Sequence, residues 1–369
     1  MSVTLILPVK NRCSLLQRVL RYYAAVEFPY PILVGNGSDG TEAEAVRRLL
    51  DSYTGHLRLS VWDQSCDMIS SYLELLERVE TAYVLLAGDD DFFVPRGVER
   101  CWRYLTAHPD YNAACGDVLS IYTHMAADGS LHLDHSFPDG YRSVTDELPS
   151  RRLVHFSTPH TMNTTYCVQR TEPLRTMLRR CVALRLYQPQ NAFSETALNA
   201  QTLLHGKLRR LPGLYHVRLR HRPAAVTRQS VEHLDYGLYV YNEASKPGWA
   251  EKLRLFVDVV AEELLRHEPL DRRTAHHVAE TMFLGWFLPR ATRNRDRLVT
   301  QLRPLASRRP AHTLLKRMPG VSTTWTFLQA LRPGRLSVDT ALKPASPYYE
   351  DFLPVYRSLM SAPSAARIS

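Results

Sequence analysis

The segment 83–95, with the sequence YVLLAGDDDFFVP, indicates the fold class and raises the first question about function. Its opening residues are apolar without alternation, which is typical of a strand buried on both faces of a parallel sheet. Three consecutive carboxylates follow at once: Asp89, Asp90 and Asp91. Because like charges side by side repel, this cluster needs a compensating cation. A hard divalent cation such as Mg²⁺ or Mn²⁺ would supply it; an exposed turn or a helix N-cap is the alternative.

Strands alternate with helices along the first 95 residues. Apolar runs predict strands at 4–9, 31–35, 57–62 and 82–87, and helical spacing predicts helices at 15–23, 46–53 and 69–76. The run 57–62 alternates, which suits a strand with one wetter face. This order of elements implies parallel βαβ units.

Polar clusters follow three of the predicted strands. They are Lys10-Asn11-Arg12, the GNGSDG run at 35–40, and the Asp triplet. Ligands in open α/β sheets bind at the carboxyl ends of the strands. We therefore expect the three clusters to lie along one edge of the sheet and to form a binding site.

The pattern changes after residue 95. We predict a helix over 98–108, a β-hairpin over 121–135 with its turn at Asp128-Gly129, and an irregular stretch over 131–165. A short helix is expected at 195–205, with Ser194 as its N-cap and Gly206 just past its end. Strands are expected at 207–221, and helices from about 245. The predicted class is α/β, with a mostly parallel, Rossmann-like sheet flanked by helices and a helical C-terminal region.

The composition limits the kinds of protein that the chain can be. The chain has 369 residues, of which 45% are hydrophobic, and its six cysteines have no metal-ligand spacing, so we expect reduced thiols and no zinc site. No segment approaches the apolar length needed to cross a bilayer, and no basic leader precedes the first apolar run. We expect a cytoplasmic protein.

The net charge of +9 is carried mainly by arginines in the second half of the chain. No helix-turn-helix, zinc-finger or RNP signature accompanies them, so we expect no nucleic-acid partner. A basic surface is the simplest explanation. Phosphate-bearing substrates, or peripheral contact with an anionic membrane at its inner face, are the alternatives.

Several common nucleotide and metal motifs are absent from the sequence. The Asp triplet does not form an EF-hand, the run at 35–40 is not GxGxxG, and no P-loop occurs. The run at 35–40 is explained by a tight turn before a helix that Asp39 or Thr41 could cap. Alternatively, Asn36 and Ser38 bind a nucleotide base or ribose.

Three stretches together resemble a family 2 glycosyltransferase with the GT-A fold. TLILPVKNRCSLLQRVLRYY resembles the strand-Pro-x-x-Asn start of that family, and ILVGNGSDGT resembles its strand-Asp-Asp-Gly-Ser-x-Asp turn. YVLLAGDDDFFVPRGVERCWRYLTAHPDY resembles its DxD region. The resemblance covers roughly 3–225. It implies a GT-A domain over 1–225, with a nucleotide-sugar half at 1–120 and an acceptor half at 121–225, followed by a mainly helical region at 226–369.

The resemblance also implies roles for individual residues. The nucleotide contacts carried over by position are Pro8, Lys10, Asn11, Asn36, Ser38, Asp63, Asp67 and Asp89, with Asp89 facing the ribose. Asp90 would bind the metal and the diphosphate, supported by Asp91. The chain departs from the family at Gly35, at Asn36, where an Asp usually recognises uracil, and at Gly88, where many members have the first Asp of the DxD motif.

Further downstream, NAFSETALNAQ resembles the acidic catalytic motif of the family, which makes Glu195 the candidate base. An acidic residue favoured by the helix dipole is the alternative. His216 or His221 would reach the metal or the leaving diphosphate, or else be structural. His160 and Asn163 are candidates for the acceptor pocket.

The resemblance implies a hexosyltransferase that uses Mn²⁺ or Mg²⁺. It would move a sugar from a nucleotide diphosphate sugar, with a UDP-sugar as first choice, to a glycan, lipid-linked or small-molecule acceptor hydroxyl. Inversion at the anomeric carbon would follow if Glu195 is the base. A nucleotidyltransferase and a non-catalytic carbohydrate-binding module are the alternatives.

Overall fold

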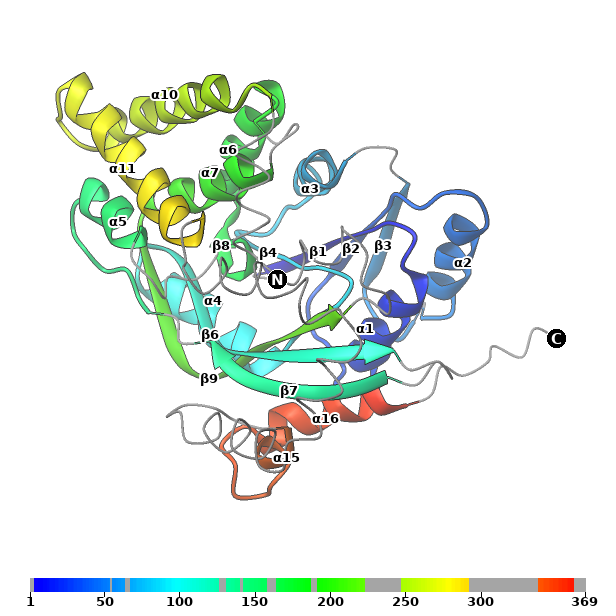
Figure 1. The fold of residues 1–369 in the computed structure, drawn as a ribbon. Helices are drawn as coiled ribbons and strands as arrows, with labels where there is room; N and C mark the ends of the chain where they lie inside the picture. Colours follow the sequence, from blue (N-terminus) through cyan, green and yellow to red (C-terminus); the bar gives the residue numbers. More distant parts are fainter. Residues whose placement is uncertain are drawn as a thin grey trace, which may run out of the picture.

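The computed structural model describes residues 3–53, 55–63, 67–125, 131–139, 142–157, 164–186, 191–222, 247–291 and 338–361. Within these residues nine strands form one sheet, in the order β3-β2-β1-β4-β8-β6-β9-β5, with β7 paired to β6. Helices lie against the sheet, and further helices gather at one end of it (Figure 1).

The first half of the sheet is parallel. β1 (Val3–Val9) lies between β2 (Ile32–Asn36) and β4 (Tyr83–Leu86), and β3 (Leu59–Asp63) follows at the edge. The connecting helices are α1 (Cys13–Ala25), α2 (Gly40–Asp51) and α3 (Met68–Leu76). The inner strands are almost wholly buried, as their apolar runs predict. The expected alternation holds less well at the edge, because Val61 of β3 is exposed.

The second half of the sheet mixes directions. Its strands are β5 (Asp91–Phe93), β6 (Tyr111–Met125), β7 (Leu131–Asp139), β8 (Val168–Arg170) and β9 (Lys207–Arg222). β6 and β9 run parallel to the first four strands, while β5, β7 and β8 run the other way. Six of the nine described strands therefore share one direction. The predicted α/β class, with a mostly parallel sheet and a helical C-terminal region, is confirmed.

The helices of the middle region are α4 (Pro95–Ala107), α5 (Pro149–Phe156), the 3-10 turn η1 (Thr164–Tyr166), α6 (Thr171–Ala183) and α7 (Asn191–Leu204). Two predictions made here were wrong. The stretch 131–165 is not irregular, because it contains β7 and α5. The helix expected at 195–205 begins at Asn191, so Ser194 lies inside it rather than at its N-cap. The hairpin of β6 and β7 is confirmed, with its turn outside the described residues.

The C-terminal helices pack against the α/β part at two separate places. α10 (Trp249–His267) and α11 (Arg272–Ala291) contact α7 and α5, while α15 (Val338–Ala341) and α16 (Tyr349–Met360) lie on the opposite side, against β7 and α1 (Figure 1). The expected domain boundary at 225/226 lies outside the described residues. In the described part of the chain, no helix is long and apolar enough to span a bilayer.

The cysteines that the structure describes are free thiols, as predicted: Cys13, Cys101, Cys115, Cys167 and Cys181. Cys66 lies outside the described residues.

Candidate active site

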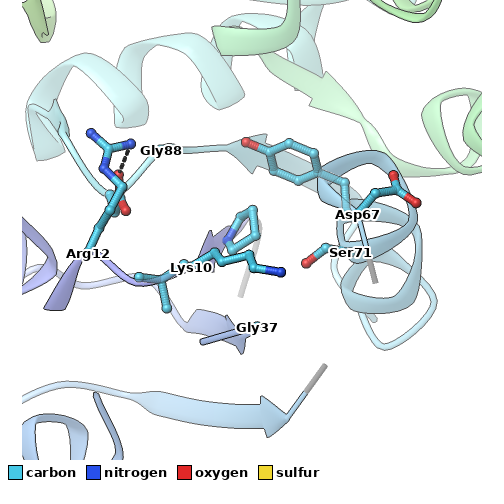
Figure 2. A pocket seen from close by; sticks show the side chains of 10 residues that line it. Lys10, Arg12, Gly37, Asp67, Ser71 and Gly88 are labelled. Carbon is cyan, nitrogen blue, oxygen red and sulfur yellow. Dashed lines mark ion pairs between the residues drawn. The ribbon is translucent and has the colours of Figure 1, made fainter. Parts of the chain in front are cut away.

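The loops that follow β1, β2 and β4 meet at one edge of the sheet and enclose a pocket of about 480 Å³. Its lining residues are Pro8, Val9, Lys10, Arg12, Gly37, Asp67, Ser71, Tyr72, Gly88 and Asp89. Figure 2 shows Arg12 and Gly88 at one end of the pocket, Asp67 and Ser71 on α3 at the other, and the Lys10 side chain extending between them. The predicted convergence of the three loops is confirmed.

Asn11 fastens the first loop to the second. Its backbone has a φ of 54°, in the left-handed region that Asn tolerates better than most residues. Its backbone amide donates to Ser38 Oγ at 2.9 Å. Its side-chain Nδ2 donates to Asp39 Oδ2 at 3.0 Å, and its Oδ1 accepts from the Asp39 backbone amide at 2.9 Å. Asp39 is the N-cap residue of α2, but it makes no side-chain cap bond to that helix. The two loops therefore hold each other in place.

Arg12 links the first loop to the Asp cluster. Its guanidinium lies 2.8 Å from Asp89 Oδ1 and 2.8 Å from Asp90 Oδ2. Asp89 is buried, and burial raises the pKa of its carboxyl to about 7 although Arg12 opposes the shift. Arg12 thus supplies a cation to two of the crowded carboxylates. Sequence reasoning placed Arg12 in the polar cluster but gave it no role, because its partners lie about 78 residues further along the chain.

Asp91 and His216 form a buried pair. In the ladder of β5 and β9, His216 lies opposite Phe93 and Arg218 lies opposite Asp91. His216 Nε2 lies 2.8 Å from Asp91 Oδ1, and both side chains are at most 2% exposed. The His216 ring also stacks on Phe93, with centroids 4.4 Å apart. His216 and Asp91, both expected near the metal, are therefore already bonded to each other, and a metal bound there would have to replace that bond.

Gly88 leaves room for the Asp91 carboxylate. The Gly88 amide donates to Asp91 Oδ2 at 2.9 Å. A Cβ at residue 88 would lie 2.8 Å from the same oxygen and 3.0 Å from Asp90 Oδ1. Contacts this short force the carboxylates to move. The glycine at position 88 therefore has a local cause: the Asp91 side chain lies where a side chain of residue 88 would begin.

Three predicted nucleotide contacts bind other parts of the protein. Asn36 is buried, its amide donates to Ala43 O at 3.2 Å, and its Oδ1 accepts from the Ser38 amide at 3.2 Å. Asp63 pairs with Arg47 at 3.1 Å, on the surface at the end of β3. Asp67 is the N-cap of α3, where it accepts from the amides of residues 69 and 70 at 3.0 and 3.1 Å. Of the three, only Asp67 lines the pocket.

Glu195 lies in the second turn of α7 and is half-buried. The electrostatic surroundings of the Tyr166 hydroxyl include both Glu195 and the Asp cluster. Burial raises the pKa of the Tyr166 hydroxyl, Arg218 opposes this, and the charges of Asp91, Glu195 and Asp90 raise it further. Tyr166 therefore lies within electrostatic reach of both the candidate base and the candidate metal ligand.

Several residues of this region were not assigned from the sequence. Arg218 donates to the Tyr166 hydroxyl at 3.3 Å and lies 4.8 Å from the centre of its ring. Ser71 and Tyr72 line the pocket from the first turns of α3. In the sequence, only the polar pair Ser70-Ser71 near the start of the helix indicated that this face of α3 could line a site. His160 and Asn163, and the side chain of His221, lie outside the described residues.

No family model and no curated protein matches the chain. Solved structures do. S. aureus TarS 1–349 in complex with UDP-GlcNAc is 16% identical, with 83% of this chain and 86% of that chain covered and a TM-score of 0.41. The mannosyltransferase PcManGT from Pyrobaculum calidifontis, in complex with GDP-Man and Mn²⁺, is 15% identical, with 97% and 86% covered and a TM-score of 0.41.

A longer S. aureus TarS structure is 15% identical, with 72% of this chain covered and a TM-score of 0.41. The match covers 43% of that chain, so this chain spans less than half of it. Identities and scores this low assign no activity to the chain.

Proposed function

We propose that the chain is a glycosyltransferase of the family 2-like GT-A type, moving a hexose from a nucleotide diphosphate sugar to an acceptor hydroxyl. The observation that carries the proposal is the pocket itself. Two cations, Lys10 and Arg12, and the buried carboxylate of Asp89 line one cavity at the carboxyl ends of three strands. Cations at this edge suit a diphosphate, and this edge is where open α/β sheets bind nucleotides.

In this proposal the donor lies along the pocket, with a UDP-sugar as first choice. The loop of Pro8, Lys10 and Asn11 contacts the base and the ribose, and Asp89 faces the ribose. Asp67 closes the far end of the pocket from α3. Asn36, Ser38 and Asp63 act indirectly. Their hydrogen bonds hold the loops after β1 and β2 in place and are not directed into the cavity.

Asp90, which pairs with the pocket residue Arg12, is a suitable ligand for Mn²⁺ or Mg²⁺. Asp90 offers a carboxylate whose side chain is 22% exposed, and hard cations of this kind bind one or two carboxylates together with phosphate oxygens. Arg12, whose side chain is 43% exposed, lies opposite the same carboxylate and can turn toward solvent or toward a phosphate. When bound, the metal would offset the charge of the departing diphosphate. Asp91, the next residue along the chain, is fixed by its buried pair with His216 and so anchors the backbone that carries Asp90.

The reaction requires one base and one leaving group. Glu195 accepts the proton of the acceptor hydroxyl, the acceptor oxygen forms a bond to the anomeric carbon, and the bond from that carbon to the phosphate oxygen breaks. The nucleoside diphosphate leaves with the electron pair. The anomeric carbon gains oxocarbenium character, as in glycoside hydrolysis, and attack opposite the leaving group inverts it. The acceptor is a glycan, a lipid-linked sugar or a small molecule.

The alternatives differ in their products. A nucleotidyltransferase on the same sheet would release pyrophosphate, whereas the proposed reaction releases a nucleoside diphosphate. A carbohydrate-binding module would bind no nucleotide in a metal-dependent manner. Chromatography of nucleotide products from a panel of nucleotide sugars separates the first two, and nucleotide binding separates the third.

The role of Glu195 is tested by Glu195→Gln, with Glu280→Gln on the exposed face of α11 as control. We expect the Glu195 variant to bind a nucleoside diphosphate as wild type does in calorimetry, while sugar transfer falls by a factor of 10² or more, about the usual contribution of a general base. The control keeps both properties. Loss of nucleotide binding in Glu195→Gln would show that the residue is structural.

A further inference from the structure

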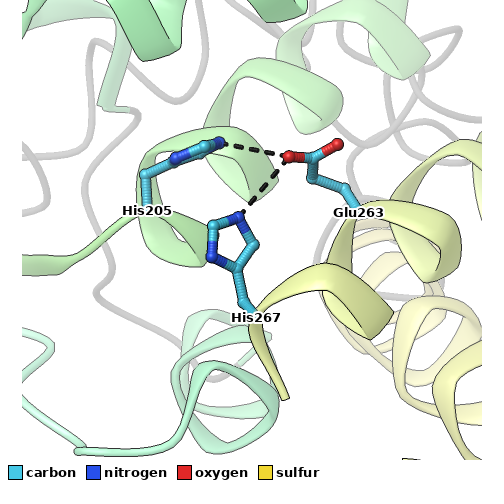
Figure 3. Close-up of side chains that lie close together, drawn as sticks. All are labelled: His205, Glu263 and His267. Atoms are coloured by element: carbon cyan, nitrogen blue, oxygen red, sulfur yellow. Dashed lines mark ion pairs between the residues drawn. The ribbon is translucent and has the colours of Figure 1, made fainter. Parts of the chain in front are cut away.

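Three side chains that take no part in the candidate active site place ligand atoms around one point (Figure 3). His205 follows the end of α7, while Glu263 and His267 lie four residues apart in the last turns of α10. Residues four apart share one face of a helix. One ligand atom from each of the three side chains lies within 4.8 Å of the others.

The two distances from Glu263 to the histidines suit a metal better than hydrogen bonds. Glu263 Oε1 lies 3.4 Å from His205 Nε2 and 3.5 Å from His267 Nε2. Ordinary N–H···O hydrogen bonds measure about 2.7–3.2 Å, so both contacts are long for that role. Zinc bonds to nitrogen and oxygen measure about 2.0–2.1 Å, and two ligands of a tetrahedral zinc are then about 3.3–3.4 Å apart.

A buried, unsatisfied nitrogen points to the same position. His205 Nε2 is inaccessible to solvent and has no hydrogen-bond partner. Buried polar atoms without partners are rare, and an ion that the structure does not contain is one explanation.

The other oxygen of Glu263 is held by two arginines. Arg180 and Arg266 donate to Oε2 at 2.8 and 2.7 Å, which leaves Oε1 facing the histidines. Such outer contacts orient the ligands of metal sites. The two guanidiniums also repel a cation, so the affinity should be lower than that of the same ligands without them. Without a metal, the cluster would be a carboxylate shared by two arginines and two neighbouring imidazoles.

We propose that His205, Glu263 and His267 bind a divalent transition metal of the zinc class, with water as a fourth ligand, and that this metal fastens α10 to α7. Two imidazoles and one carboxylate match the ligand preferences of Zn²⁺, whereas Mg²⁺ and Mn²⁺ prefer oxygen ligands. The site is independent of the proposed transferase reaction. It gives the C-terminal helical region a fixed attachment to the α/β part of the molecule.

The test uses the full chain without a polyhistidine tag, stripped of metal and titrated with Zn²⁺ by calorimetry. We expect one tight site in wild type, and at least a tenfold loss of affinity in His205→Ala and in His267→Ala. His276→Ala is the matched control, because His276 also faces a carboxylate on α10, at 3.0 Å from Asp258, but has no second histidine in reach among the described residues. Its affinity should equal that of wild type.

Two further measurements keep the test decisive. Co²⁺ in place of Zn²⁺ should give the visible absorption of a four-coordinate site in wild type and in Asp90→Asn, but not in His267→Ala. Circular dichroism checks that the variants are folded, and the exposed His267 is the safer of the two positions. The proposal is overturned if wild type binds no Zn²⁺, or if both histidine variants bind it as tightly as His276→Ala does.

Discussion

The Gly88 amide donates to Asp91 Oδ2, and the Gly88 Cα faces the same oxygen. The missing side chain at residue 88 thus leaves room for the Asp91 carboxylate, whose other oxygen lies 2.8 Å from His216 Nε2. The sequence shows the glycine but not the reason for it. His216 is about 125 residues away from Asp91, and only the pairing of β5 with β9 brings them together.

Gly88→Ala should destabilise the protein by about 1–3 kcal/mol, the usual cost of forcing an extra methyl group into a packed site. The reason is the short approach to the Asp91 carboxylate. Urea denaturation of Gly88→Ala, Asp91→Ala and the double variant measures the coupling between the two positions. We expect the glycine substitution to cost less once the carboxylate is gone. Strictly additive costs would contradict this explanation.

At the scale of single elements, the N-terminal strands and helices were predicted well, since buried parallel strands are continuous apolar runs. The start of α7 was not, because Ser194 looks like an N-cap but the helix begins at Asn191. α5 and the part of β7 beyond residue 135 were missed, since their sequences carry many polar residues. The three loops of the site were predicted to converge because βαβ order fixes which strand ends share an edge. The link through Arg12 depends on side-chain packing that no local pattern contains.

Asp67 caps α3 and also lines the pocket, and two substitutions separate these roles. Asp67→Ala should cost about 0.5–2 kcal/mol of stability through loss of the cap. Asp67→Asn should retain stability, since Asn caps as well as Asp does. If the carboxylate also contacts the donor, nucleotide affinity falls in both variants. Denaturation and calorimetry on the same samples check this. Equal stability of Asp67→Ala and wild type would show that the cap is unimportant.

At the scale of the whole molecule, α16 packs against α1, so a C-terminal helix covers an N-terminal one. Ser358 Oγ on α16 donates to the carbonyl of Arg18 on α1 at 2.7 Å, and Phe352 is fully buried. At the other end of the sheet, an aromatic cluster joins α7 to α10 and α11, with Phe193 and Phe283 stacked at 4.8 Å. The helical composition of this region was predicted from the sequence. Its two docking places were not, because helical periodicity does not say what covers a helix.

Phe352→Ala should destabilise the N-terminal sheet as well as α16, by about 3–5 kcal/mol, the usual cost of truncating a buried Phe. Met360→Ala in the same helix is the control and should change little, since Met360 is 50% exposed. Denaturation followed by tryptophan fluorescence and by circular dichroism should give one shifted transition. If the sheet of Phe352→Ala unfolds at the same denaturant concentration as in wild type, α16 does not belong to the folding unit of the sheet.

The central claim is a metal-dependent nucleotide diphosphate site at the pocket of Lys10, Arg12 and Asp89. Calorimetric titration of UDP, GDP, ADP, CDP and TDP, each with Mn²⁺ and then with chelator, tests it directly in wild type and in Asp90→Asn. We predict one-site binding of at least one of these nucleotides, lost on chelation and weakened at least tenfold by Asp90→Asn. Absence of binding across the whole panel, or equal affinity in the folded Asp90→Asn variant, would contradict the claim.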